Sequence, residues 1–274
     1  MISIKELKKS KIVQSILITI LIWAAILISW YISRHKYKDY SSYDQYLSRG
    51  GSIARLNKDI EHNPRSAGLY NLRGLFYGHQ GEIDLAIQDF TQAIELKPNF
   101  AEAYNNRCNS YLIIKELDFA LNDCNKSINI NPTDASVYYN RALVYQGLGE
   151  YDKAKLDYNK VIKLDTKYYK AFSNRGTIEF NEIKYDLAIS DYSKAIDLNP
   201  ECIEAYYNRG LCYLQLMELK KAIDDFNKVI ALNPASASAY YNRGSAYQAN
   251  GQPDMAKKDF DKAYELDPTL LKGK

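Results

Sequence analysis

Residues 203–236 read IEAYYNRGLCYLQLMELKKAIDDFNKVIALNPAS, and residues 237–270 read ASAYYNRGSAYQANGQPDMAKKDFDKAYELDPTL. The two stretches align without a gap over 34 residues, and each has a proline at position 32. A fixed period of this length is the sequence signature of a repeat architecture. Proline marks the same period along most of the chain, at Pro64, Pro98, Pro132, Pro200, Pro234 and Pro268.

The period divides residues 67–270 into six repeats that follow one another without insertion or deletion. They span 67–100, 101–134, 135–168, 169–202, 203–236 and 237–270. Position 4 is aromatic in all six repeats, position 8 is small, position 20 is alanine, and position 24 is aromatic in five. Positions 4, 8 and 11 lie along one face of a helix, and so do positions 20, 24 and 27. Each repeat is therefore predicted to contain two helices.

The residues between and after these two helical faces support the division. Gly81, Gly149 and Gly251 follow the first face and suit the C-terminus of a helix. The closing proline ends the second helix, because proline cannot continue it. Small side chains at positions 8 and 20 let the two backbones approach, and the aromatic side chains fill the space around them. One such helix pair cannot bury its apolar face alone, so the repeats are expected to stack.

This pattern resembles the tetratricopeptide repeat family in its period, its small residues at 8 and 20, its aromatic residues at 4, 11 and 24 and its proline at 32. The resemblance covers residues 67–270. It implies an all-α fold, a right-handed superhelical solenoid of helix-turn-helix repeats whose first helices line a concave groove. The sequence departs from the pattern at Thr166, Cys108, Cys124 and Glu179. A buried carboxylate at position 11 is costly, so we expect repeat 4 to be locally irregular.

The N-terminal segment predicts a membrane anchor ahead of the repeats. Residues 12–32 are 21 residues without a charge, which is enough to cross a ~30 Å hydrocarbon core as a helix. Trp30 and Tyr31 stand at the end of this stretch, where amphipathic rings favour the membrane interface. A cleaved signal peptide would have a shorter apolar region with small residues just beyond it. The sequence therefore favours one uncleaved transmembrane helix.

Charge is unevenly distributed along the chain. Residues 1–38 hold seven of the 36 Lys and Arg and one of the 33 acidic residues, which leaves 29 basic and 32 acidic residues. The remainder is slightly acidic, and this opposes nucleic-acid binding, which needs a concentrated basic face. Four lysines precede the predicted span and three basic residues follow it. The positive-inside rule thus favours a cytoplasmic N-terminus and a non-cytoplasmic repeat domain.

The segments between these features complete the predicted domain organisation. Ile53, Leu56 and Ile60 match the second-helix pattern of the later repeats, so a degenerate capping half-repeat is expected there. The chain end after residue 270 is too short for a further capping helix. The predicted segments are a basic tail (1–11), a transmembrane helix (12–32), a linker with the capping half-repeat (33–66), six repeats (67–270) and a C-terminal tail (271–274).

The sequence contains no catalytic, metal-binding or cofactor-binding motif. His35, His62 and His79 are too scattered to indicate a metal cluster. No cysteines form a C-x-x-C pair, and no glycine-rich phosphate loop follows a strand. We therefore predict that the chain is not an enzyme and needs no cofactor or metal.

The four cysteines fall into two pairs. Cys108 and Cys124 occupy the facing positions 8 and 24 of repeat 2, where they are either small buried thiols or a disulfide. The sequence favours two thiols, because free cysteine behaves as a small buried hydrophobe. Cys202 and Cys212 are ten residues apart in a mostly helical stretch, which separates them by about 15 Å and prevents a bridge.

Arginine at position 7 and aspartate at position 23 recur in all six repeats. Matched opposite charges at fixed positions favour a structural pair between neighbouring helices over a ladder of ligand-binding charges. The arginines are Arg73, Arg107, Arg141, Arg175, Arg209 and Arg243, and the aspartates are Asp89, Asp123, Asp157, Asp191, Asp225 and Asp259.

The resemblance also implies a ligand surface on positions 2, 5, 9, 12 and 13 of the first helices. The residues expected to bind a partner are Asn71, Asn105, Asn109, Tyr139, Gln146, Lys170, Asn181, Tyr207, Gln215, Tyr241 and Gln248. The surface is rich in amides and tyrosines. The position-5 tyrosines lie away from the small-residue seam, so they are not expected to be needed for packing the paired helices.

Together these features predict a membrane-anchored scaffold or adaptor that binds a peptide segment or a protein partner in its groove. Two alternatives remain, an accessory or assembly subunit of a membrane or envelope complex and a helical-repeat RNA-binding protein. The sequence identifies neither the partner nor the oligomeric state.

Overall fold

The computed structural model describes residues 52–273. This part of the chain contains thirteen α-helices and one 3₁₀ helix, with no strand. The all-α helix-turn-helix architecture expected from the 34-residue period is therefore confirmed. The predicted transmembrane segment, residues 12–32, lies outside the described residues. Within the described range, no helix combines the length and the apolar composition that crossing a membrane requires.

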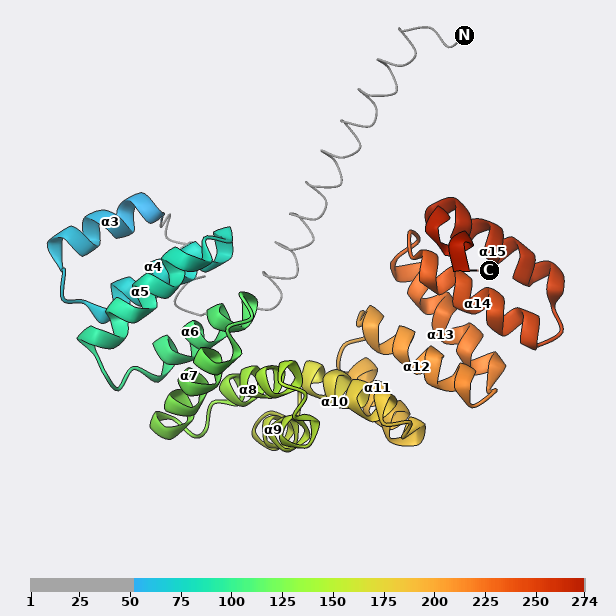
Figure 1. Ribbon diagram of the computed structural model, residues 1–274, viewed down its shortest axis with the longest axis horizontal. Helices are drawn as coiled ribbons and strands as arrows, with labels where there is room; N and C mark the ends of the chain where they lie inside the picture. Colours follow the sequence, from blue (N-terminus) through green and yellow to red (C-terminus); the bar gives the residue numbers. More distant parts are fainter. Residues whose placement is uncertain (1–51, 274) are drawn as a thin grey trace, which may run out of the picture. The chain divides into compact units, whose positions relative to one another are not determined.

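Each repeat consists of a first helix, here helix A, and a second helix, helix B (Figure 1). A short helix, α3 (Ile53–His62), precedes the first pair. The A helices are α4 (Ala67–Gln80), α6 (Ala101–Ile113), α8 (Ala135–Gly147), α10 (Tyr169–Asn181), α12 (Ile203–Gln215) and α14 (Ala237–Ala249). The B helices are α5 (Ile83–Leu96), α7 (Leu117–Ile130), α9 (Tyr151–Leu164), α11 (Tyr185–Leu198), α13 (Leu219–Leu232) and α15 (Pro253–Leu266).

The two helices of a repeat pack closely because a small residue at position 8 of helix A lies against a large side chain at position 24 of helix B. A Cβ atom added at Gly74 would lie 2.7 Å from a ring carbon of Phe90, closer than real side chains approach. The same clash would arise between position 210 and Phe226, at 2.9 Å. Glycine at position 8 therefore lets the ring of helix B rest against the backbone of helix A.

The turn between helices A and B places its position-15 residue in the left-handed backbone region. Glycine occupies this position in three repeats, with φ of 75° or 83°. The same region is adopted by Lys115, Ile183 and Met217 in the other three, with φ of 60–63°. The glycine turns predicted from the sequence are thus confirmed, and the remaining turns have the same geometry without glycine.

Helix α3 packs as the B helix of an incomplete repeat. Leu56 and Ile60 are its buried residues, and α3 contacts α4. Arg73 Nη1 donates a hydrogen bond to Asn57 Oδ1 at 2.9 Å, which ties α3 to the first full repeat. At the other end, a 3₁₀ helix, η1 (Pro268–Gly273), follows α15 and contacts it. Its turns extend into the predicted C-terminal tail, residues 271–274, and end at Gly273.

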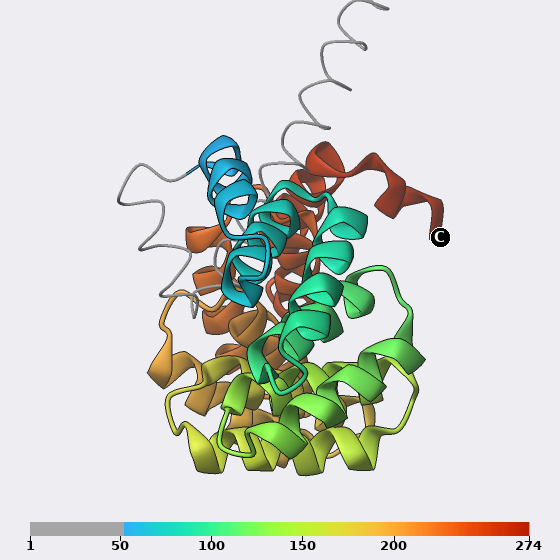
Figure 2. The same ribbon diagram turned by 90° about the vertical axis from the view of Figure 1, so that its left-hand side faces the viewer.

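The chain divides into two compact units, one ending at Ile130 and the other spanning Asn131–Lys274. The first unit includes α3 to α7, and the second includes α8 to α15 and η1. Figure 2 gives a second view of the antiparallel helix pairs within each unit. In the second unit α10 contacts α12, and α12 contacts α14, so successive A helices adjoin one another.

Repeat 2 differs from the others by a covalent bond between its helices. Cys108 of α6 and Cys124 of α7 form a disulfide, with their Cα atoms 5.5 Å apart. The sequence-based preference for two free thiols is therefore wrong. Facing positions 8 and 24 bring the two Cα atoms to the separation that a disulfide requires. Cys202 and Cys212 are free and buried, in agreement with the prediction that they do not bridge.

Candidate partner-binding surface

The six arginine–aspartate pairs form part of the scaffold. In each repeat the arginine of helix A donates from Nε and Nη2 to the two carboxylate oxygens of the aspartate on helix B, at 2.5–2.9 Å. Such bidentate pairs are short and geometrically specific. The aspartates are buried in every repeat. The structural interpretation of these pairs is thus confirmed.

The same arginines also connect neighbouring repeats. Arg209 Nη1 donates to Ser193 Oγ of the preceding B helix at 2.9 Å. The Arg209 guanidinium also lies over the rings of Tyr206 and Tyr213, at 5.7 and 5.9 Å from their centroids. Because Nε, Nη1 and Nη2 of Arg209 all donate within the scaffold and two rings lie beside the guanidinium, it has little left to offer a ligand.

A second ladder links positions 5 and 6 of successive A helices. Asn174 Nδ2 donates to Tyr139 Oη at 3.0 Å, and Asn242 Nδ2 donates to Tyr207 Oη at 2.8 Å. In the first unit Asn106 Nδ2 donates to Asn71 Oδ1 at 3.0 Å. Residues predicted to bind a partner at position 5 are therefore structural links between repeats.

The position-5 tyrosines also pack against helix B of their own repeat. The rings of Tyr207 and Phe226 have centroids 5.9 Å apart, and those of Tyr241 and Phe260 are 5.4 Å apart. The expectation that these tyrosines are unnecessary for packing is wrong, because a tyrosine side chain reaches beyond the small-residue seam to the ring at position 24. Burial raises the pKa of Tyr139 well above the ordinary tyrosine value, so its hydroxyl stays neutral.

In the first unit the structure places Asn71, Asn105 and Asn109 in buried positions. Asn71 Nδ2 also donates to Glu102 Oε1 at 3.2 Å. Asn109 lines a small, open depression, together with Leu75, Gly78, His79, Phe90, Asn106 and Ser110.

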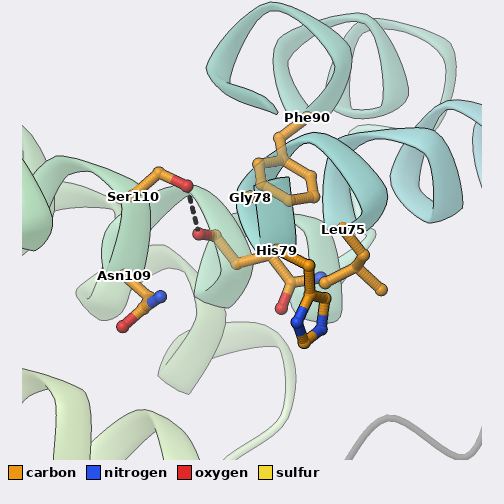
Figure 3. Close-up of a pocket in the computed structure, with 7 residues that line it drawn as sticks. Leu75, Gly78, His79, Phe90, Asn109 and Ser110 are labelled. Atoms are coloured by element: carbon orange, nitrogen blue, oxygen red, sulfur yellow. Dashed lines mark hydrogen bonds between the residues drawn. The ribbon is translucent and has the colours of Figure 1, made fainter. Parts of the chain in front are cut away.

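Figure 3 shows this depression between α4 and α6, with Leu75, His79 and Phe90 on one side and Asn109 and Ser110 on the other. Asn106 Oδ1 is buried and accepts no hydrogen bond from any described residue. Ser110 Oγ donates to the backbone oxygen of Asn106 at 3.1 Å and so leaves the side-chain acceptor unused.

In the second unit the predicted residues divide by exposure. Asn181, Gln215 and Gln248 are exposed at the C-terminal ends of their A helices. Lys170 and Gln146 are half-buried, and Gln146 Oε1 accepts a hydrogen bond from Tyr158 Oη. The exposed amides remain available to a partner, whereas Gln146 is already engaged.

Sequence reasoning missed the position-6 asparagines as structural residues. Asparagine occurs at this position in repeats 2 to 6, and this recurrence was the available signal. The structural role of these asparagines depends on a second residue, because in three repeats the asparagine Nδ2 donates to the position-5 side chain of the preceding repeat, 35 residues earlier. Within residues 52–273, no three side chains of the metal-ligating types gather closely enough to hold an ion.

Comparison with known families agrees with this geometry. The pattern of the family described as Tetratricopeptide repeat matches residues 67–100, 135–168, 203–236 and 237–270. A pattern described as TPR repeat matches residues 184–217. Together the matches cover more than half of the chain. Comparison with curated proteins gives no significant match.

Several solved structures are similar to this chain. YrrB, a TPR protein with an unusual peptide-binding site, is 28% identical with a TM-score of 0.57, over 65% of this chain and 92% of that one. MamA is 28% identical with a TM-score of 0.56, over 64% of this chain and 95% of that one. PilF of Pseudomonas aeruginosa is 18% identical with a TM-score of 0.67, over 74% of this chain and 92% of that one, and shows the fold alone.

Proposed function

Because this chain belongs to the tetratricopeptide repeat family, we propose that it is a membrane-anchored scaffold that binds a peptide segment of a partner protein. Proteins of this family are generally non-catalytic interaction scaffolds, and the similar structures support a protein–protein interaction role. The peptide-binding site and the anchor are the two specific parts of the proposal.

The observation that carries the peptide-binding part concerns Asn106, which lines the depression between α4 and α6 and whose Oδ1 accepts no hydrogen bond from a described residue. A buried acceptor without a donor costs free energy, and a ligand N–H that reaches it removes that cost. The amide of Asn109 lines the same depression. An extended peptide supplies N–H and C=O groups in alternation, which suits adjoining amide side chains. The peptide-binding site of YrrB adds support by similarity.

The depression also has an apolar wall, formed by Leu75 and Phe90. This combination of apolar surface with a few polar groups is typical of ligand pockets. We therefore expect the bound segment to place a small apolar side chain against Leu75 and Phe90, with its backbone beside Asn106 and Asn109.

The second unit offers a further contact surface through the exposed Gln215 and Gln248. Tyr241 lies half-buried on α14, and no described residue donates a hydrogen bond to its hydroxyl. A hydroxyl with a free acceptor beside an apolar ring suits a partner contact. Tyr207 is less suited, because its hydroxyl already accepts from Asn242.

The anchor part of the proposal depends on residues 12–32. Their 21 uncharged residues match the length of a transmembrane helix. We expect the full-length chain to stay with membranes after alkaline carbonate washing. Release into the wash, or N-terminal sequencing that finds cleavage near Arg34, would contradict the anchor.

A steric block tests the peptide-binding part. Gly78 lines the depression, and a Cβ added there meets only Ala86 Cβ, at 4.0 Å. Gly78→Leu should therefore fill the depression without a clash, and leucine favours a helix interior more than glycine does. The matched control is Gly68→Leu on the same helix, where an added Cβ meets nothing within 4 Å.

Partners would first be identified by proximity labelling from the C-terminus of the full-length chain in its native membrane. We expect Gly78→Leu to remove capture of a direct partner and Gly68→Leu to retain it, with the same helical content in both. If Gly78→Leu binds normally and charge reversal at the exposed helix-B residues Lys194 and Lys228 abolishes capture, the partner uses helix B instead. That result would favour the alternative of a subunit held in a larger complex by its outer surface.

A further inference from the structure

Position 8 and position 24 make the closest contact between the helices of a repeat. In four repeats position 8 is glycine and position 24 is a phenylalanine or tyrosine. A Cβ added at these glycines would lie 2.7–3.1 Å from a carbon of that ring. In repeat 3 the pair is Ala142 and Tyr158, both with 0% exposure. The fold therefore fills this space with one large ring against one very small residue.

Repeat 2 departs from this arrangement at both positions together. Cys108 and Cys124 are each 0% exposed and are joined to one another. Two separate thiols fill less volume than a phenyl or phenol ring, and an underfilled core loses contacts on all sides. The disulfide draws the helices together by a bond instead of a ring. A disulfide can replace the ring contact only if positions 8 and 24 are both cysteine, and in repeat 2 both are.

The other two cysteines show that disulfide formation is selective. Cys202 and Cys212 are free, and burial raises their pKa values to about 11 and about 12. Thiol–disulfide exchange needs a thiolate, so these two groups react slowly. Selectivity for one pair follows from the fold, since only positions 8 and 24 of one repeat present two sulfur atoms to each other.

We propose that the Cys108–Cys124 disulfide forms in the cell as repeat 2 folds, and that the repeats therefore lie in an oxidising compartment. Structural disulfides persist in such compartments and are rare in the reducing cytosol. The oxidant is the disulfide of a thiol–disulfide oxidoreductase. One cysteine thiolate attacks that disulfide to give a mixed disulfide, and the second displaces the enzyme sulfur. Two electrons and two protons pass to the enzyme, which leaves as a dithiol.

The timing of this step follows from burial. Both sulfur atoms lie inside the α6–α7 contact, so exchange takes place before these helices close. The proposal concerns the compartment and does not depend on partner binding. The proposed anchor matters only for the side of the membrane. If the chain is anchored, an oxidising compartment places the repeats on the side opposite the cytoplasm. The four lysines before residues 12–32 favour the same orientation independently.

The thiol state of the full-length chain in its own cells tests the proposal. Cells are quenched in acid, the chain is denatured, and free thiols are counted by the gel shift of a maleimide polymer. A Cys202→Ser/Cys212→Ser variant isolates the pair of interest. We expect no adduct on this variant before reduction and two after it. Two adducts before reduction would overturn the proposal.

A second variant keeps the test decisive if the serine variant folds poorly. Cys108→Gly/Cys124→Phe installs the pair used in repeats 1, 5 and 6. We expect this variant to fold without a disulfide and to show two adducts both before and after reduction. The unaltered chain should show two adducts before reduction and four after it. Four adducts on the unaltered chain before reduction would place the repeats in a reducing compartment. This readout is independent of partner capture, so failure of the proposed function would not affect it.

Discussion

Arg141 and Asp157 join the two helices of repeat 3 through two parallel hydrogen bonds, from Nε to Oδ2 at 2.7 Å and from Nη2 to Oδ1 at 2.8 Å. Asp157 is 6% exposed. The hydrogen bonds to Asp157 raise the pKa of the Arg141 guanidinium above its usual range. Removing the arginine would leave a buried carboxylate without its partner, and this is far more costly than losing an exposed ion pair.

We predict that Arg141→Met lowers the free energy of unfolding by about 3 kcal/mol, as measured by urea denaturation. The double variant Arg141→Met/Asp157→Leu should recover most of the loss, because it removes the uncompensated charge. Lys257→Met, which breaks an exposed pair with Asp261, is the control and should have no measurable effect. A double variant no more stable than Arg141→Met would show that the pair is not coupled.

The ladder between repeats gives a second prediction with a built-in control. Tyr207→Phe removes the acceptor of Asn242 Nδ2 while keeping the ring against Phe226. We expect a loss of about 1 kcal/mol in unfolding free energy. Tyr241→Phe should leave stability unchanged, because no described residue donates a hydrogen bond to the Tyr241 hydroxyl. Equal losses in both variants would contradict the ladder.

The helix pairs could be predicted from the sequence because their determinants are local and periodic. A proline every 34 residues, alanine at position 20 and a small residue at position 8 specify where helices end and where they touch. Repeat 3 has Thr166 where other repeats have proline, and repeat 4 has Ile183 where three repeats have glycine, yet both repeats form the helix pair. In both places the packing of the flanking helices maintains a geometry that the local residue does not favour.

The candidate site was harder to predict, because helical spacing gives a face but not the reach of a side chain. Tyr207 lies on the predicted face, yet its ring extends to Phe226 and its hydroxyl to Asn242. Contacts between residues 35 apart depend on how successive A helices are placed, which one repeat cannot reveal. The depression around Asn106 has the same origin, since residues of α4 and α6 form it together.

The turn at Ile183 is strained, and this gives a third prediction. Its φ is 63°, a conformation that a β-branched residue rarely adopts, and its side chain is 72% exposed. Ile183→Gly should therefore raise the unfolding free energy by about 1 kcal/mol, since it removes the strain and loses little burial. Gly149→Ala at the equivalent turn should lower it by a similar amount. A loss of stability in Ile183→Gly would show that the exposed side chain makes a stabilising contact.

Glu179 gives a prediction about pH. Tyrosine holds position 11 in the other five repeats, where its ring lies against the arginine at position 7. In repeat 4, helix α10 is regular, so the irregularity expected there is absent from this helix. Glu179 Oε2 is nevertheless buried, and no described residue donates a hydrogen bond to it. Burial raises the pKa of the Glu179 carboxyl, with the nearby Asp191 adding to the effect.

A raised pKa means that the folded state binds the Glu179 proton more tightly than the unfolded chain does. The resulting stabilisation is complete below the ordinary pKa, about 4.3, and is lost as pH rises through the raised value. Glu179→Gln, which cannot ionise, should therefore gain stability relative to the unaltered chain as pH rises towards 7. Thermal melts of both chains across this window would measure the gap. A gap that stays constant with pH would exclude the ionisation of Glu179 as its cause.

The disulfide supplies the last prediction. Cys108 and Cys124 are 16 residues apart in sequence, and closing a loop of about 15 residues stabilises a fold by about 3 kcal/mol. Reductant should therefore lower the unfolding free energy of the unaltered chain by about that amount. Cys108→Gly/Cys124→Phe should be insensitive to reductant, because a ring against glycine replaces the bond, as at Gly74 and Phe90. If the unaltered chain is equally stable with and without reductant, repeat 2 is held by packing alone, and the bond would then contribute nothing to the fold.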